Sequence, residues 1–153
     1  KDKEPYSFGS EAKVLIRSAI NLRYSLLREW YSAFERATCD GSASPLLPVI
    51  TPSGQLVNDE LQLFDKLLVA PVVERDASKR LIYLPPGHWY RLGNNTAPLE
   101  GQRWIVEDVS LSDIPCFVKA GSTIDFCVPG LTTQQTWENE VRTERYGKVA
   151  VGG

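Results

Sequence analysis

The feature that most constrains the fold is the run LLVAPVV at residues 67–73, which is apolar at every position. We expect such a strand to be covered on both faces, because a solvated face carries a polar residue at every second position. A charged break follows, and the apolar residues 81–84 predict a second strand that ends at Pro85-Pro86-Gly87. The segment therefore predicts a strand in the middle of a layered β structure.

Further short strands are predicted at residues 61–64, 89–92, 102–106, 115–119 and 122–128. Gly and Pro residues lie between these strands, and no segment between them has the 3.6-residue period of a helix. This pattern is typical of an antiparallel β-sandwich in a mainly β protein. We place this sandwich at residues 42–128, beginning in the proline-rich segment SASPLLPVITPSGQ. Residues 129–153 turn polar and are predicted to be a polar tail or the start of a further C-terminal β region.

Before the strands, apolar residues recur with a 3.6-residue period from Val14 to Ala37 and predict one long amphipathic α-helix. We expect it to run from about Ser10, a suitable N-cap, to about Asp40, because Gly41 supplies a left-handed stop. Its apolar face is wider than a small following domain can cover. The helix is therefore either a core helix of this domain or the last helix of a larger one, and the period does not distinguish the two.

The composition excludes several classes of function. Seventeen basic and nineteen acidic residues give a net charge of −2 without charged blocks, so no nucleic-acid partner is expected. No apolar run approaches the roughly 20 residues of a membrane span, and the first residues, KDKEPYSFG, lack the apolar core of a signal peptide. The cysteines Cys39, Cys116 and Cys127 lack zinc-site spacing and are expected to be buried free thiols. A pairing of Cys116 with Cys127 across a hairpin depends on geometry and stays open.

Few residues suggest a reaction. His88 is the single histidine, and its position after Pro-Pro-Gly predicts a solvent-facing turn residue rather than part of a catalytic triad. The acids Asp59, Glu60, Asp108 and Asp113 include carboxylates of the kind that hydrolyse glycosides in pairs. Acids beside strand ends are more often solvated or cap turns. Neither a cofactor nor a metal is expected.

Aromatic residues and one tripeptide offer two further candidate sites. Trp89, Tyr90 and Trp104 are suited to stacking on sugars, although aromatic residues in strands more often belong to a core. Asn94-Asn95-Thr96 is an N-glycosylation acceptor in a protein that follows the secretory route. Its Gly-Asn-Asn turn is expected to tolerate a glycan.

Four ordered motifs carry a resemblance to glycoside hydrolase family 31, the family of α-glucosidases, glucosidase II and α-xylosidases. They are EPY at 4–6 with Phe8-Gly9, LRYSLL at 22–27 with Trp30-Tyr31 and Phe34, LLVAPVVERDASKRLIYLPPGHWY at 67–90, and LSDIPCFVKAGSTI at 111–124. The chain resembles the C-terminal part of that family. The resemblance implies that residues 1–41 hold the last helix of a (β/α)8 catalytic barrel and that the β-sandwich follows it.

The resemblance also implies what the chain lacks. The family hydrolyses terminal α-glucosyl or related residues by a retaining mechanism with two aspartates, and both would lie upstream of this chain. No catalytic or substrate-binding residue is therefore carried over. The implied partners are the rest of the barrel, in the same precursor or a companion chain, and through it an oligosaccharide. The family favours the secretory pathway, namely the endoplasmic reticulum, the lysosome or secretion, but the residues themselves leave the location unknown.

Several positions depart from the family pattern. Arg28-Glu29 replaces a Pro-Tyr pair, so a helix kink is expected to be lost, and Leu47 replaces an arginine. Phe64 and Asp76 stand where glycines are usual, and Arg91 stands in place of an aspartate. These departures motivate a second hypothesis, an inactive relative that serves as a structural or assembly subunit. A third hypothesis, a free carbohydrate-binding sandwich, depends on the aromatic residues named above.

Overall fold

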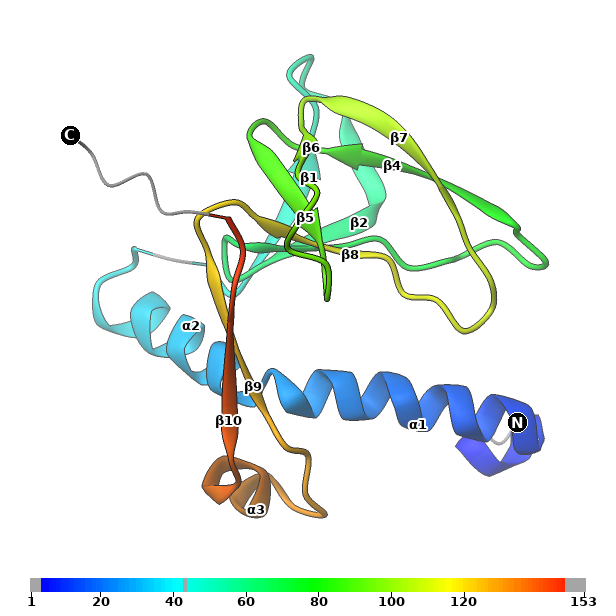
Figure 1. The fold of residues 1–153 in the computed structure, drawn as a ribbon, viewed down its shortest axis with the longest axis vertical. Coiled ribbons are helices and arrows are strands. Elements are labelled where there is room, and N and C mark those ends of the chain that lie inside the picture. Colours follow the sequence, from blue (N-terminus) through cyan, green and yellow to red (C-terminus); the bar gives the residue numbers. More distant parts are fainter. Residues whose placement is uncertain (1–3, 43, 148–153) are drawn as a thin grey trace.

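The computed structural model describes residues 4–42 and 44–147, which form a central β-sheet with a layer on each face (Figure 1). The sheet has six strands in the order β1-β2-β3-β8-β5-β6, and every neighbouring pair is antiparallel. The strands are β1 (Leu46–Ile50), β2 (Leu56–Leu63), β3 (Leu67–Val69), β8 (Cys116–Lys119), β5 (His88–Arg91) and β6 (Leu99–Glu100). The predicted antiparallel β-sandwich is thereby confirmed.

The first layer is an antiparallel ribbon of β4 (Lys79–Leu84) and β7 (Arg103–Asp108), which covers one face of the sheet. Leu68, Phe117 and Trp89 point from the sheet into this core, and each is at most 1% exposed. Ile82 and Leu84 enter it from the ribbon and are completely buried. This two-layer core is the β-sandwich proper.

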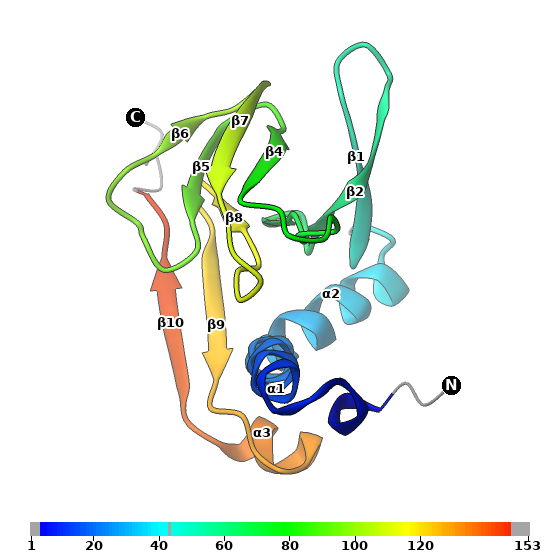
Figure 2. The same ribbon diagram turned by 90° about the vertical axis from the view of Figure 1, so that its right-hand side faces the viewer.

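The second layer consists of two helices and a second ribbon on the opposite face (Figure 2). The 3₁₀-helix η1 (Pro5–Phe8) leads into α1 (Ser10–Ser25) and α2 (Leu27–Cys39). The strands β9 (Thr123–Cys127) and β10 (Val141–Arg145) pair with each other, and the short helix α3 (Thr133–Glu138) connects them. Within residues 4–42 and 44–147, no helix is long and apolar enough to cross a membrane.

The apolar run that opens the strand series is covered on both faces, as its composition predicts. Leu67 packs in the helix-side core and Leu68 in the ribbon-side core, with exposures of 1% and 0%. The strand is shorter than the expected residues 67–73 because Pro71 has no N–H to continue the ladder. Ala70, the last residue before it, still donates its N–H to the carbonyl of Pro115 at 2.9 Å.

The predicted single helix is interrupted at one residue, so that part of the prediction was wrong. Leu26 has φ −91° and ψ 15°, and its N–H bonds to the carbonyl of Arg23 at 3.2 Å. This tightened turn separates α1 from α2 and leaves Leu26 buried at 4% exposure. The outer bounds, Ser10 and Cys39, agree with the prediction to within one residue.

Two strands, β1 and β6, were not predicted, and β10 falls in the segment for which a polar tail and a further β region were both expected. The prolines of the segment SASPLLPVITPSGQ argue against a strand there, because Pro48 has no N–H to donate. β1 is an edge strand, where a proline is tolerated, and its pairing with β2 shifts register between Pro48 and Val49. β6 has only two residues, and β10 lies in the polar segment after Pro129.

Candidate functional site

The acidic residues singled out in the sequence are each held by their own neighbours. Asp59 forms an ion pair with Arg80, with 2.9 Å between Oδ2 and Nη1, and Asp113 accepts hydrogen bonds from the N–H and hydroxyl of Ser110. Those two hydrogen bonds lower the pKa of Asp113. Asp108 is exposed at the end of β7. Asp59, Asp108 and Asp113 therefore occupy structural positions on separate segments.

Glu60 contradicts the expectation of a solvated acid. It is 1% exposed between β2 and β4, and its Oε1 accepts the N–H of Tyr83 at 2.8 Å. The other oxygen, Oε2, and the hydroxyl of Tyr83 are buried and have no hydrogen-bond partner among the residues that the structure describes. Burial raises the pKa of Glu60 to about 7, against smaller lowering effects of the Tyr83 N–H and of Arg80.

His88 and the aromatic candidates do not form a binding platform. His88 is exposed at the start of β5, as predicted. Trp89 is 1% exposed and donates its indole N–H to the carbonyl of Pro85 at 2.7 Å, whereas the next residue, Tyr90, packs on the opposite face of the sheet. Trp104 lies on β7 with 47% exposure. Trp89 and Tyr90 are therefore core residues, as expected, and the three rings cannot stack on one sugar together.

A buried ion pair joins α2 to the sheet and was missed in the sequence. Glu29 is 6% exposed, and its Oε2 lies 2.6 Å from the ammonium nitrogen of Lys66. The other oxygen of Glu29 accepts the N–H of Asp125 at 2.8 Å, and Lys66 also donates to the carbonyl of Thr123 at 2.8 Å. One carboxylate thus fixes the helix to β9 and to the turn before β3.

The neighbouring departure, Arg28, attaches α3 to the same helix. Its Nη2 donates to the carbonyl of Trp137 at 2.9 Å, and its guanidinium carbon lies 4.9 Å from the centre of the Trp137 ring. Tyr31 meets the same ring edge-on at 5.1 Å. Arg28 and Glu29, which depart from the family pattern, therefore both have specific partners in this fold.

Of the remaining departures, Phe64 and Arg91 have specific partners, whereas Leu47 has no structural explanation. Phe64 and Asp76 both have φ 57°, the left-handed conformation that glycine adopts most readily. Phe64 is 1% exposed and meets the Trp30 ring edge-on at 4.8 Å, so its burial offsets the cost of that conformation. Arg91 pairs with Glu107, and this bond raises the pKa of Arg91.

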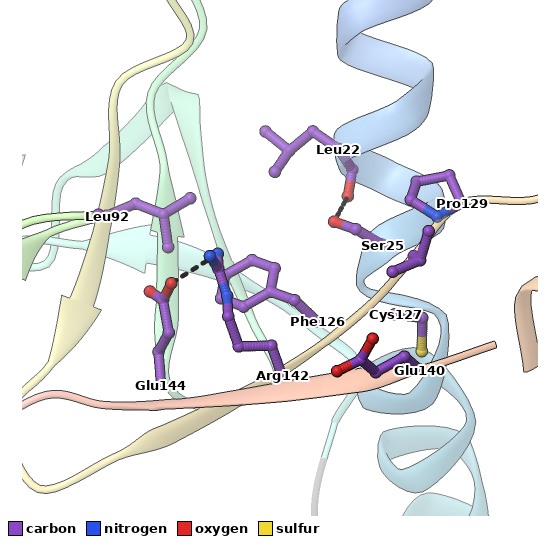
Figure 3. A pocket seen from close by; sticks show the side chains of 11 residues that line it. Leu22, Ser25, Leu92, Phe126, Cys127, Pro129, Glu140, Arg142 and Glu144 are labelled. Carbon is purple, nitrogen blue, oxygen red and sulfur yellow. Dashed lines mark hydrogen bonds and ion pairs between the residues drawn. The ribbon is translucent and has the colours of Figure 1, made fainter.

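A cavity of about 560 Å³ lies between α1 and the β9–β10 ribbon (Figure 3). Leu22, Leu92 and Phe126 supply apolar walls. Three charged side chains line it: Glu140 lies just before β10, and Arg142 and Glu144 on β10 form an ion pair at 2.7 Å. Because the Arg142 guanidinium also lies 5.7 Å above the Phe126 ring, it covers the aromatic face that a ligand would need.

The helices present apolar side chains that are largely exposed to solvent. Val14, Ile20 and Phe34 are 66%, 44% and 54% exposed, and no residue of α1 is buried. An apolar groove of about 390 Å³ lies between the helices and the sheet. Leu46 and Leu61, which line it, are 46% and 39% exposed. A surface of this kind marks a docking face rather than a reaction centre.

The other predicted positions lie outside any catalytic arrangement. Cys39, Cys116 and Cys127 are free thiols, but Cys39 is exposed instead of buried. Burial raises the pKa of Cys116 to about 12. Asn94 is exposed in the loop after β5. Within residues 4–42 and 44–147, no three His, Cys, Asp or Glu side chains gather as metal ligands.

Comparison with known proteins gives consistent matches. Residues 51–124 match the profile described as the glycosyl hydrolase family 31 C-terminal domain. Over 81% of its length the chain is 35% identical to a 1,6-alpha-glucosyltransferase of Sporosarcina globispora and 37% identical to human neutral alpha-glucosidase C. It spans only 10% and 14% of those proteins.

The fold matches a solved structure over nearly the whole chain. A GH31 dextranase of Flavobacterium johnsoniae in complex with isomaltotriose superposes with a TM-score of 0.86 and 29% sequence identity. The match covers 95% of this chain and 18% of the dextranase chain. It therefore includes both the helices and the β-sandwich.

Proposed function

Because the chain belongs to glycosyl hydrolase family 31 and carries its C-terminal domain, we propose that it is a non-catalytic part of a larger glycoside hydrolase. In this proposal residues 1–41 supply the last helix of a (β/α)8 barrel and residues 42–128 form the sandwich that braces it. The segment after residue 128 begins a further β region. Two aspartates upstream of this chain hydrolyse terminal α-glucosyl or related residues with retention of configuration.

The observation that carries the proposal is the exposed apolar face of the helices. Ile20 and Phe34 are 44% and 54% exposed on helices that are otherwise fixed to the sandwich through Glu29 and Lys66. Two helices held firmly on one side and left apolar on the other are suited to covering another hydrophobic layer. In the barrel of a family 31 enzyme, that layer is the remainder of the barrel.

A matched pair of variants in the barrel-containing enzyme tests this role. Ile20→Asp places a charge on the proposed barrel contact, and we expect loss of soluble protein or of α-glucosidase activity by at least about tenfold. Asn21→Asp, at the neighbouring exposed position, is expected to leave both unchanged. Equal effects of the two substitutions would contradict the barrel contact. Hydrolysis of an α-glucoside by this chain alone would contradict the placement of catalysis upstream.

An inactive relative that serves as a structural or assembly subunit is the alternative. The departures that motivated it are accommodated, since Arg28 and Glu29 have partners and Phe64 is buried. They accordingly support retention of the fold and carry no information about catalysis. Sequencing the upstream barrel distinguishes the alternatives, because loss of either aspartate favours the inactive subunit.

We further propose Asn94 as an N-glycan acceptor where the parent protein enters the secretory pathway. The side chain is exposed, and its Oδ1 accepts the N–H and the hydroxyl of Thr96 at 3.2 and 2.8 Å. Both hydrogen bonds use Oδ1, so the turn does not occupy Nδ2, the atom that a glycan would modify. Glycopeptide mass spectrometry of secreted protein tests the site, with Thr96→Ala expected to abolish the modification.

A further inference from the structure

The exposed strand edges of this fold differ in how well they are protected against pairing with another chain. β1 carries Pro48 and a register shift, and β6 is two residues long. β10 has three charged residues among its five. Proline, short length and charge are the usual means by which proteins block an open edge.

The free edge of β4 is covered by the side chain of Glu60 from β2 and by its own Arg80. Glu60 accepts the N–H of Tyr83 at 2.8 Å, and Arg80 donates to the carbonyls of Asp59 and Pro71 at 3.0 and 3.1 Å. The side of β9 away from β10 is similarly occupied, because the N–H of Asp125 donates to Glu29. Neither edge is available to a second strand.

β7 is the exception. It pairs with β4 on one side only, and its six residues, RWIVED, include no proline or glycine. Its three charged residues, Arg103, Glu107 and Asp108, lie at the two ends of the strand and leave the apolar centre WIV uninterrupted, whereas the charges of β10 are spread along the strand. The N–H of Tyr83 points away from β7, whereas Val109 donates to the carbonyl of Ser78 at 3.0 Å. Because hydrogen-bonded pairs alternate along an antiparallel ladder, the residues of β7 that bond to β4 are Arg103, Ile105 and Glu107. The backbone groups of residues 104, 106 and 108 then face outward. Within residues 4–42 and 44–147, no hydrogen bond reaches them from outside the ladder.

The sequence of this edge is complementary to itself. Two antiparallel copies centred on Ile105 place Trp104 opposite Val106 and Arg103 opposite Glu107 of the second copy. The side chains of Trp104 and Val106 are 47% and 61% exposed and form an apolar pair on the outer face. A shift of the centre to Val106 instead places Trp104 opposite Asp108, which removes both matched pairs.

The register also agrees with the backbone. Pairing centred on Ile105 makes Trp104 and Val106 the residues that exchange hydrogen bonds, and these are the residues whose N–H and C=O groups face outward. Arg103 of the second copy approaches Glu107, which already accepts from Arg91, so one carboxylate links two guanidinium groups. Side-chain pairing, charge and backbone direction thus favour the same arrangement.

We propose that β7 pairs with β7 of a second copy of this chain, which joins two ribbons into a four-stranded sheet of order β4-β7-β7-β4. The contact is isologous, because the same strand serves both partners. It is an interface of the small, reversible class. This interaction does not depend on the proposed catalytic role of the parent protein.

Sedimentation of the purified protein that contains this chain tests the proposal over about 1 µM to about 1 mM, the range in which such weak interfaces assemble. We expect a concentration-dependent dimer. Val106→Pro removes an outward N–H while leaving the ladder to β4 intact, and is expected to weaken association by at least about tenfold. Val106→Thr keeps the N–H and is expected to dimerise within about threefold of the parent protein. A monomer throughout the range, or equal association by both variants, overturns the proposal.

Cross-linking tests the register independently of the proline variant. In a Cys39→Ser background, Ile105→Cys places two thiols directly opposite each other at a non-hydrogen-bonded pair, where Cα atoms lie about 4.5 Å apart. Trp104→Cys places the two thiols diagonally and too far apart to bridge. Mass spectrometry under non-reducing conditions should detect the linked peptide from the first variant only. Absence of that peptide, or equal linking of both variants, overturns the register.

Discussion

The buried carboxyl of Glu60 makes a specific prediction about how stability depends on pH. Burial at 1% exposure raises its pKa from 4.5 to about 7 in the folded protein. Between these values the folded state binds more protons than the unfolded state, so stability falls as the pH rises. The stabilisation of the neutral carboxyl is fully present below pH 4.5 and is lost as the pH passes through about 7. A shift of that size corresponds to about 3 kcal/mol.

Replacement of Glu60 by glutamine isolates this effect. The amide oxygen of glutamine accepts the Tyr83 N–H as the protonated acid does, but the side chain carries no charge at any pH. Urea unfolding at pH 5 and pH 8 should therefore show a loss of about 3 kcal/mol in the parent protein and a much smaller loss in Glu60→Gln. Glu100→Gln is the matched control, because Glu100 is exposed. If Glu60→Gln and Glu100→Gln retain the same pH dependence, Glu60 is not the titrating group.

Three further substitutions test other parts of the structure, each by urea unfolding. Lys66→Met leaves the Glu29 carboxylate buried without its cation and should cost about 3 kcal/mol, part of which Glu29→Gln in the same protein should recover. Asp76→Val should cost about 1–2 kcal/mol because φ is 57°, whereas Asp76→Gly should be nearly neutral; equal costs would exclude backbone strain as the cause. Gly101→Ala should cost more than about 2 kcal/mol, since its Cβ would lie 2.0 Å from the carbonyl oxygen of Pro85.

The strands that the sequence predicts well are those whose apolar pattern is set by their own position in the sheet. The burial of Leu67 and Leu68 can be predicted without knowing which residues contact them, because a run without polar residues already indicates a strand covered on both faces. Glu60 and Glu29 were not predicted to be buried because their partners, Tyr83 and Asp125, lie 23 and 96 residues away. A pattern within one segment of the sequence contains no information about contacts with residues that far along the chain.

The sequence does contain one local signal that Glu29 is buried. Leu26, Glu29 and Ala33 follow one another at intervals of three and four residues, which places the acid on the same helix face as two apolar residues. All three are buried in the structure. An acid on the buried stripe of a helix indicates a buried cation elsewhere, and here that cation is Lys66.

The helix break shows that the shape of this region does not depend on the proline that the family pattern contains. Arg28 stands in place of that proline, so the sequence predicted an unbroken helix, yet the chain turns at Leu26. Leu26 is 4% exposed, and two and three residues later Arg28 and Glu29 bind Trp137 and Lys66. Contacts on both sides of the turn therefore fix the angle between α1 and α2, and tertiary packing replaces the local constraint. It follows that restoring the proline as Arg28→Pro should not stabilise the protein, because the kink already exists and the substitution removes the contact with Trp137.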